Sequence, residues 1–513
     1  FQAEDGIRDR SPSRGLGDVY KRQKLDSLAI RRQKVPAYTL MERASEFSFN
    51  VLLNNWPNTK KVFVFCGNGN NAGDGYLIAH LAKEIGLESF IIQASPSNKI
   101  SGASKKAFEL ATASKVKKIS ISGFKKKSLR DSVIVDALLG TGINGTVRSR
   151  ISKLILEINK KSKNTPVLSV DIPSGICANR GIGLGAHIQA DVTATFIGRK
   201  RGCFTSIGRT ASGNVVFDDL GISSSTKNQI KTNCHLLDME KNLPKLKNRK
   251  GDAHKGDFGH VLVIGGDKGF GGAAILASKA AVFSGSGLVS LATRSIHVEA
   301  ALSSCPELMV TGIESGQDLE ALLTKSTVVV IGPGLGQSAW SEQMLQRTFM
   351  EAKSRNLPVV LDADGLNLLS KLKFSTGTPK KMVSTPHPGE AARLLNKEVS
   401  EIQKDRFKSV IGLEKKLGSV CVLKGSGSLV CYKKGGEQEI GVCGAGNTGM
   451  AKGGMGDVLA GLIGSFISQG LSLVEATETA VDLHSKAADI GSLELGMTIT
   501  PTDVIRNIRY FLR

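Results

Sequence analysis

The chain has 513 residues, more than one hydrophobic core ordinarily organises, so its length predicts two or more domains. Its composition, 41% hydrophobic and 22% charged, is typical of a globular protein, and no apolar run approaches the ~18 residues that a membrane-spanning helix needs. The net charge of +22 is compatible with nucleic acid, an anionic membrane or phosphorylated ligands, but an aromatic content of 5% leaves few stacking platforms for single-stranded nucleic acid. We interpret most of the charge as solvated surface, and we expect neither a membrane nor a nucleic acid as partner.

The eight cysteines form no CxxC pair. Their spacing therefore indicates neither a zinc site nor a disulfide framework, and free thiols are typical of a reducing compartment. Because no secretory signal is visible either, we expect the protein in the cytoplasm.

The first 23 residues show neither helical nor strand periodicity and resemble the translation of a sequencing adapter. We expect residues 1–23 to be an artefact, with a natural disordered arm as the alternative. On that interpretation the natural N-terminus is missing and the first native helix is clipped near Lys24. Apolar residues then follow helical spacing over Lys24–Asn54, with a break at Pro36.

A glycine-rich loop follows the first predicted strand. The run KVFVFC over Lys61–Cys66 predicts a buried strand, and the loop Gly67–Gly75 opens a helix over Tyr76–Ile85. Strand, glycine-rich loop and helix in this order are typical of a nucleotide site in a doubly wound sheet, although the loop matches neither GxGxxG nor the Walker pattern. A strand at Phe90–Ile92 and a helix near Ser104–Thr112 continue the alternation.

Two further strands end in carboxylates. Asp131–Asp136 leads into the glycine-rich loop 137–147, and Pro166–Asp171 leads into Ile172–Gly175. The carboxyl ends of parallel strands share one edge of a sheet, so the polar groups after these strands and after Lys61–Cys66 are expected in one crevice. An aspartate there is often only a helix cap, but three glycine-rich loops favour a site. Ligands that are all oxygens suit a hard cation rather than zinc.

The second half of the chain starts over after a polar segment. The stretch Gly221–Lys247 is rich in serine, asparagine and lysine, and it predicts a linker over 226–247 between a domain over 24–225 and a domain over 248–513. Five strands are predicted in the second domain, each leading into a glycine-rich or polar loop: His260–Ile264, Thr327–Ile331, Val359–Leu361, Met382–Ser384 and Val420–Leu423. This again indicates an α/β domain with its special loops at strand ends.

The densest motif is GAGNTGMAKGGMGDVLAG over Gly444–Gly461, which runs into a predicted helix over Val458–Phe466. Clustered glycines and a helix N-terminus present backbone N–H groups to a phosphate or a developing anion. A carboxylate in such a place would repel the phosphate unless it does chemistry, so Asp457 is our candidate base for an attacking hydroxyl. The alternative is that Asp457 is only an N-cap.

Two other residues of this half are candidate site residues with a structural alternative. His387 lies between two prolines that hold it rigidly, and it belongs either to a site or to the turn itself. Lys424, followed by glycines and serines, suits phosphate by charge and backbone donors, or else is a surface lysine of a hairpin.

Together these motifs resemble the bifunctional NAD(P)H-hydrate repair enzymes, in which an NAD(P)HX epimerase is fused to an ADP-dependent (S)-NAD(P)HX dehydratase. The resemblance covers residues 24–222 and 248–513. It rests on GNGNNAGDG, DALLGTGINGTVR, LSVDIPSG, HKGDFGHVLVIGG, GPGLG, LDADGLN, TPHPGE, LKGSG and GNTGMAKGGMGDVLAG, in this order. It implies an α/β fold with two three-layer domains, an N-terminal Rossmann-like epimerase domain and a C-terminal ribokinase-like domain.

For the first domain the resemblance implies interconversion of the R and S epimers of nicotinamide cofactors hydrated at C6. Asp171 is the candidate for acid–base work. A potassium ion is implied at Asn71, Asp136 and Ser174. The implied contacts to NADHX or NADPHX are Asn70, Asn71, Ala72, Gly73, Asp74, Gly140, Thr141, Gly142, Ile143, Asn144, Gly145, Thr146 and Asp171.

For the second domain the resemblance implies dehydration of the S epimer to NAD(P)H, with ADP converted to AMP and phosphate. Asp457 would deprotonate the C6 hydroxyl, which attacks the terminal phosphate of the nucleotide; phosphate, a better leaving group than water, is then eliminated. Magnesium is expected with the nucleotide. The implied nucleotide contacts are Lys424, Gly425, Ser426, Gly427, Ser428 and Gly456, and the implied hydrate contacts are Ala273, Gly336, His387 and Asp457.

Two departures and two alternatives accompany this interpretation. Ala72 replaces a glycine that is common in the first motif, and the clipped first helix would weaken folding or association of the epimerase half. A small-molecule kinase shares the glycine loop and Asp457, and a non-catalytic binding protein would suit the positive charge. The fused epimerase half argues against a kinase, and a pure binder has no need of Asp457. We expect a homo-oligomer.

Overall fold

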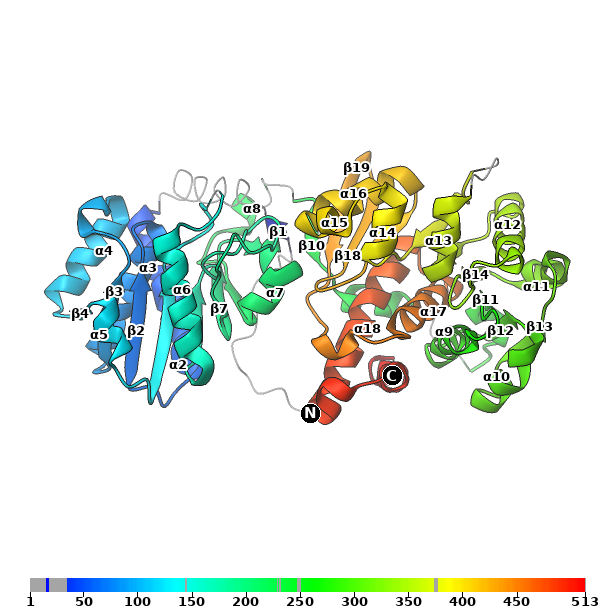
Figure 1. Cartoon of the computed structure of the whole chain (residues 1–513), viewed down its shortest axis with the longest axis horizontal. Helices are drawn as coiled ribbons and strands as arrows, with labels where there is room; N and C mark the ends of the chain where they lie inside the picture. Colours follow the sequence, from blue (N-terminus) through cyan, green and yellow to red (C-terminus); the bar gives the residue numbers. More distant parts are fainter. Residues whose placement is uncertain are drawn as a thin grey trace. The chain divides into compact units, whose positions relative to one another are not determined.

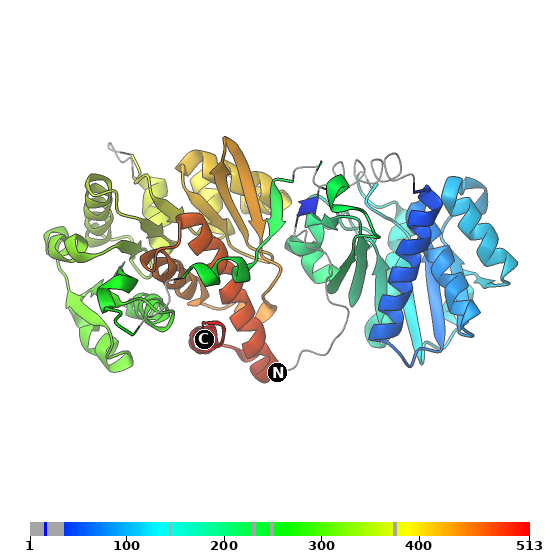
Figure 2. The same cartoon turned by 180° about the vertical axis from the view of Figure 1, so that it is seen from behind.

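The computed structural model describes residues 15–17, 35–143, 145–227, 229, 232–246, 251–372 and 377–512 (Figures 1 and 2). The chain divides into unit 1, Phe1–His235, and unit 2, Leu236–Arg513. Each unit is an α/β domain with a central sheet, as the sequence predicts. Among the described residues, no helix is both long and apolar enough to cross a bilayer.

Unit 1 is built on seven parallel strands in the order β4-β3-β2-β5-β6-β7-β9. The chain moves from β2 to β3 in one direction and returns to place β5 on the other side of β2, so loops after β2 and β5 diverge and leave room for a ligand. The strands are β2 (Lys61–Cys66), β3 (Glu88–Gln93), β4 (Lys117–Ile119), β5 (Ser132–Ala137), β6 (Val167–Val170), β7 (Val192–Phe196) and β9 (Asn214–Asp218).

Both faces of this sheet are buried. Val62 and Val64 of β2 face the core under α2, α3 and α4, whereas Phe63 and Phe65 face the core under α5 and α6 (Figures 1 and 2). Burial on both faces explains the unbroken apolar runs that predict these strands. The helices of unit 1 are α2 (Ala37–Asn55), α3 (Asn70–Glu84), α4 (Gly102–Ala113), α5 (Ile121–Lys125), α6 (Ser149–Lys161), α7 (Ser206–Ser212) and α8 (Ser224–Lys227).

The start of α3 corrects the sequence prediction. The predicted loop ends at Gly69, and residues 70–75 form the first turns of α3 rather than preceding a helix that begins at Tyr76. A side chain on Gly75 would lie 2.6 Å from the Cβ of Ala137, and one on Gly73 would lie 2.5 Å from the sulfur of Met41. These two glycines therefore serve close packing of a helix, although in sequence they resemble the glycines of a turn.

The described part of the N-terminal segment is short. β1 (Leu16–Gly17) pairs in parallel with β8 (Arg199–Lys200). Residues 1–14 and 18–34, which include the predicted start of the first helix, lie outside the described residues. The interpretation of residues 1–23 as an artefact stays a prediction.

Unit 2 contains a ten-stranded sheet in the order β10-β19-β18-β17-β16-β15-β14-β11-β12-β13, parallel from β13 to β17 and antiparallel at β18 and β19. The order reverses between β11 and β14, and this is the second topological switch point of the chain. The strands are β10 (Cys234–Leu236), β11 (His260–Ile264), β12 (Leu288–Thr293), β13 (Met309–Gly312), β14 (Val328–Ile331), β15 (Val359–Leu361), β16 (Met382–Ser384), β17 (Val420–Leu423), β18 (Leu429–Lys434) and β19 (Glu437–Val442).

One face of this sheet packs against α9, α17, α18 and α19, and residues of the sheet and of these helices form one hydrophobic core. A side chain on Gly461 of α17 would lie 2.0 Å from the carbonyl oxygen of Ala277, so α17 and α9 cross at backbone contact. The helices of unit 2 are α9 (Gly271–Phe283), α10 (Val298–Ser304), α11 (Glu320–Lys325), α12 (Ala339–Ser354), α13 (Ala363–Lys371), α14 (Pro388–Leu395), α15 (Val399–Lys404), α16 (Arg406–Leu417), α17 (Met455–Ser468), α18 (Leu473–Leu495) and α19 (Pro501–Ile508).

Two predicted boundaries in unit 2 differ from the structure. α17 begins at Met455 instead of Val458, so Asp457 lies inside its first turn. The predicted loop after Val359–Leu361 is helical from Ala363 onward. In both places the first turn of the helix contains glycine, which is rare inside helices, so the sequence pattern predicts a loop there.

Part of the predicted linker 226–247 has regular structure. It carries β10, and the buried Leu237 and Met239 belong to the core of unit 2. The division between the units falls within β10.

Candidate active sites

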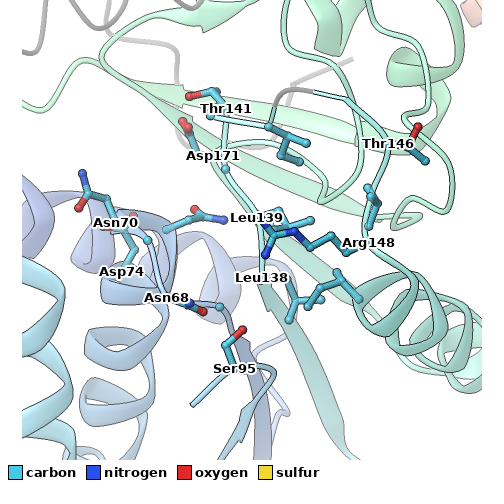
Figure 3. A pocket seen from close by; sticks show the side chains of 18 residues that line it. Asn68, Asn70, Asp74, Ser95, Leu138, Leu139, Thr141, Thr146, Arg148 and Asp171 are labelled. Atoms are coloured by element: carbon cyan, nitrogen blue, oxygen red, sulfur yellow. The ribbon is translucent and has the colours of Figure 1, made fainter. Parts of the chain in front are cut away.

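A pocket of about 720 Å³ opens at the carboxyl ends of β2, β5 and β6 in unit 1 (Figure 3). These three strands are neighbours in the sheet, which is why the polar loops after them meet. The predicted residues that line the pocket are Asn70, Asn71, Asp74, Gly140, Thr141, Gly142, Ile143, Thr146 and Asp171.

Not every predicted contact lines this pocket. Ala72 and Gly73 are buried within α3, where they pack against the protein, and Gly145 is not among the lining residues. Asn144 lies outside the described residues. Sequence reasoning missed Asn68, Ser95 and Arg148, which also line the pocket (Figure 3).

Asp136 is a buried carboxylate that neighbouring hydroxyls surround. Its Oδ1 accepts a hydrogen bond from the Ser174 hydroxyl at 2.6 Å, and its Oδ2 accepts from the Ser169 hydroxyl at 2.9 Å and the Ser174 amide at 2.8 Å. Burial raises the pKa of Asp136, while these hydrogen bonds oppose the shift. A nearby cation would stabilise the ionised form of this carboxylate against the cost of its burial.

Asn71 has a buried amide group whose oxygen and nitrogen find no hydrogen-bond partner among the residues that the structure describes. It packs against Gly140, where an added Cβ would lie 3.4 Å from its own Cβ. The adjacent Leu139 amide donates to the Ser174 hydroxyl at 2.8 Å, so the same loop joins Asn71 to the Asp136–Ser174 pair. The Asn71 amide oxygen, the Asp136 carboxylate and the Ser174 hydroxyl are oxygen ligands of the kind that a hard monovalent cation binds.

Asp171 lies on the wall of this pocket in a strained backbone conformation, with φ of 70°. It forms a buried ion pair with Lys200, whose ammonium group also donates to the Thr195 hydroxyl at 2.9 Å and the Phe196 carbonyl at 3.0 Å. Each side chain of the pair is less than 5% exposed. Sequence reasoning missed Lys200, because its position within the basic run RKR indicates surface charge.

In unit 2, side chains from the ends of β15 and β17 meet the start of α17. The Lys424 ammonium donates to Asp362 at 2.6 Å, and Asp362 also accepts from the Thr385 hydroxyl at 2.7 Å. A Cβ added to Gly456 would lie 3.2 Å from the Lys424 ammonium. Lys424 does follow a strand of a hairpin, β17–β18, but its side chain is only 18% exposed, so it is not the surface lysine of the alternative.

Asp457 occupies the first turn of α17, next to Gly454 with φ of 92°. Burial, with the charge of Asp362, raises its pKa to about 6. Within the described part of the chain it receives no side-chain hydrogen bond and forms no ion pair, unlike Asp362. This carboxylate is therefore available to accept a proton near neutral pH.

His387 has a structural role as well as a place near the site. Its ring Nδ1 accepts from the Gly389 amide at 2.9 Å, and its own amide donates to Glu390 at 2.7 Å, which together cap α14. Burial and the charge of Lys424 lower the pKa of His387, so the imidazole is neutral at pH 7. Burial raises the pKa of Glu390 to about 7.

The remaining predicted hydrate contacts lie at the switch point between β11 and β14. The Gly336 amide donates to Asp364 at 3.1 Å, and Asp364 contributes to the raised pKa of Asp457. A side chain on Gly334 would lie 3.1 Å from the Cβ of Ala273. Asp267, which sequence reasoning did not select, holds this region by accepting from Arg294 at 3.0 Å and from Ser338 at 2.7 Å.

Comparison with known proteins covers both units. Residues 37–202 match the family model described as YjeF-related protein N-terminus, and residues 261–509 match the model described as NAD(P)H-hydrate dehydratase. The bifunctional NAD(P)H-hydrate repair enzyme of Coxiella burnetii is 42% identical over 95% of this chain and 97% of its own length. That of Escherichia coli is 40% identical over 90% of this chain and 86% of its own length.

A solved structure supports the fold of unit 2. A ribokinase-like superfamily protein from Enterococcus faecalis is 31% identical, with 55% of this chain and 96% of that chain covered and a TM-score of 0.50. The ribokinase-like architecture predicted for the C-terminal domain is thereby confirmed.

Proposed function

The chain belongs to the family of bifunctional NAD(P)H-hydrate repair enzymes, and from that membership we propose how its two units share the repair. Unit 1 interconverts the R and S epimers of NADHX and NADPHX. Unit 2 dehydrates the S epimer to NAD(P)H at the expense of ADP, with AMP and phosphate as products. The single observation that carries the assignment of the second step is Asp457, a buried carboxylate at a glycine-rich helix N-terminus that has no ion-pair partner in the described part of the chain.

In unit 2, Asp457 takes the proton of the C6 hydroxyl, and the oxygen attacks the terminal phosphorus of ADP, whose bond to the bridging oxygen breaks to release AMP. The first amides of α17 lie beside Asp457 and suit the charge that develops on the transferring phosphoryl group. The C6–O bond then breaks with phosphate as leaving group, and loss of a proton from C5 restores the dihydronicotinamide. Lys424 is held in place by Asp362 and lies beside Gly456, where its ammonium group can donate to a phosphate oxygen.

Magnesium enters this proposal with the nucleotide. Among the described residues, no cluster of three or more histidine, cysteine or acidic side chains forms a metal cage. Magnesium is commonly held by one or two carboxylates together with substrate phosphates, and Asp362 and Asp364 at the start of α13 suit that role. Bound there, the ion would neutralise phosphate charge.

In unit 1, we assign the proton transfers at C6 to Asp171, with Lys200 holding it in place. The ion pair orients Asp171, and a carboxylate so placed can serve as an acid–base group of the epimerisation. Potassium, proposed at Asn71, Asp136 and Ser174, would tie together the loops after β2, β5 and β6 that form the pocket.

The experiment that tests the whole proposal follows the recovery of dihydronicotinamide absorbance from a mixed R and S hydrate, with ADP, magnesium and potassium. Complete recovery requires both activities. Recovery that stops at the S fraction would leave the dehydratase assignment standing and remove that of the epimerase. Absence of recovery with either ADP or ATP, from folded protein, contradicts the proposal, and a stable phosphorylated product would identify a kinase instead.

The dehydratase is expected to lose activity in acid. Because the pKa of Asp457 is about 6, the base is protonated as pH falls through that value, and kcat/KM for the hydrate at saturating ADP should fall about tenfold per pH unit below it. The measurement is a pH profile from 4.5 to 8.5 on S hydrate, with the epimerase rate at each pH as the control for intact protein. A profile that is flat down to pH 5 contradicts the assignment of Asp457.

Potassium is expected to stabilise unit 1. Replacing sodium chloride with potassium chloride should raise the unfolding temperature of unit 1, because a ligand that binds only the folded state adds free energy of unfolding, about 2.7 kcal/mol at a hundred times its Kd. Asn71→Ala should abolish the difference between the two salts. Asn68→Ala, in the neighbouring loop, is the matched control and should keep it; an equal response of wild type and Asn71→Ala would remove the proposed ligand.

The site of action and the assembly complete the proposal. All eight cysteines are free thiols, seven of them buried, which suits a reducing compartment, and we propose the cytoplasm. We also propose a homo-oligomer, which light scattering of the full chain tests.

A further inference from the structure

Arg406, the first residue of α16, lies behind the loop 424–428 and is 1% exposed. Its Nη2 donates to the carbonyl oxygens of Leu423 at 3.1 Å, Lys424 at 3.3 Å and Gly427 at 3.5 Å. Its Nη1 donates to the Gln403 side chain at 3.1 Å. Burial lowers the pKa of Arg406 to about 10, which still leaves the guanidinium charged at pH 7.

These contacts fix the direction of the loop backbone. In a trans peptide the C=O and the following N–H point to opposite sides. Since the Lys424 and Gly427 carbonyls turn toward Arg406, the N–H groups of Gly425 and Ser428 turn away from it, on the side where Gly425 and Ser426 are exposed. These two outward N–H groups are positioned to donate to an anion on that side of the loop.

The loop can approach the guanidinium only because position 425 is a glycine. Gly425 has φ of 135°, and a Cβ added there would lie 3.0 Å from Nη1 of Arg406. Gly427 also has a positive φ, 63°. The first glycine of the KGSGS motif is thus explained by the close approach of Arg406, which lies 18 positions before Lys424 in the sequence.

The charges near the loop also favour the binding of an anion there. The Lys424 ammonium forms an ion pair with Asp362 at 2.6 Å, so the carboxylate offsets much of its positive charge. The buried Arg406 guanidinium places its positive charge in surroundings of low dielectric, where an anion across the loop is attracted more strongly than in water.

We propose that Arg406 is a positioning residue for the nucleoside diphosphate: by holding the carbonyls of the loop 424–428 inward, it aims the loop amides at the phosphates of ADP. This inference rests on the proposed function of unit 2. On this inference the affinity of the loop for ADP depends on Arg406, which lies outside all the sequence motifs that carry the resemblance to the family.

The test compares Arg406→Met and Arg406→Lys with the wild type in the full chain, and measures KM for ADP, KM for the S hydrate and kcat. Arg406→Met should raise the ADP KM at least tenfold, with the hydrate KM within twofold of wild type. Arg406→Lys, which keeps the charge but fewer donors, should fall between them. Lys408→Met removes an exposed cation from the same helix and should change neither KM.

Epimerase activity of the same samples reports on unit 1, and a thermal transition of unit 2 reports on its folding. An ADP KM for Arg406→Met within twofold of wild type overturns the inference, as does a loss confined to kcat. If Arg406→Met does not fold, an ADP KM of Arg406→Lys equal to wild type overturns it. Failure of the proposed function is distinct, since wild type itself would then show no ADP-dependent turnover.

Discussion

Replacing Asp457 with asparagine is expected to lower the rate of ADP-dependent dehydration by about 10²–10⁴-fold, the range that a general base contributes. Asparagine keeps the size of the side chain and its place in the first turn of α17, but it cannot take the proton of the C6 hydroxyl. The loss should appear in kcat, because the nucleotide loop and Lys424 are untouched. The measurement is single-turnover recovery of dihydronicotinamide from pure S hydrate.

The matched control for Asp457 is Glu342, which also lies in the first turn of a helix, α12, and therefore contributes the same interaction with a helix dipole. Glu342→Gln should dehydrate the hydrate at the wild-type rate. Asp457→Glu should retain part of the activity, because a carboxylate remains. Full activity of Asp457→Asn would show that another group accepts the proton, and the pH profile predicted above would then belong to that group.

The strands that the sequence predicts best are those buried on both faces. β2, β11, β15, β16 and β17 have the predicted bounds, because a parallel strand between two layers of helices must be apolar at nearly every position. The hairpin β18–β19 is not predicted from the sequence. Its polar end, where Lys433 faces Gln438 and Lys434 faces Glu437, interrupts the apolar pattern.

Within the sites, sequence predicted the loops better than the partners of their side chains. Ser174 donates to Asp136, and Asn71 packs against Gly140 in the loop after β5, because these residues follow or end neighbouring parallel strands. The alternation of strands and helices in the sequence already predicts this topology. Lys200, Asp362 and Arg406 act through contacts that depend on burial. A lysine in the run RKR and an arginine after an aspartate look like surface charges until tertiary packing covers them.

The second large effect is expected at the pair of Asp171 and Lys200. Asp171→Asn should reduce epimerisation by about 10²–10⁴-fold, so that repair of a mixed hydrate stops at the S fraction while dehydration of pure S hydrate is unchanged. Lys200→Met should reduce epimerisation as well, and it should also lower the free energy of unfolding of unit 1 by about 3–5 kcal/mol, because it leaves a buried carboxylate without its partner. Both are measured on the full chain, by absorbance recovery and by denaturant unfolding.

The double variant Lys200→Met with Asp171→Asn separates chemistry from folding. Removing both charges relieves the uncompensated carboxylate, so stability should return toward wild type while epimerisation stays lost. The control is Lys60→Met, which breaks the exposed pair of Lys60 with Asp131 in the same unit and should change neither stability nor rate appreciably. Wild-type epimerisation by Asp171→Asn would exclude this carboxylate as the acid–base group. Recovery of activity together with stability in the double variant would mean that the ion pair supports only the fold, and the proton transfers would then have to be assigned to another group on the pocket wall, such as Asp74.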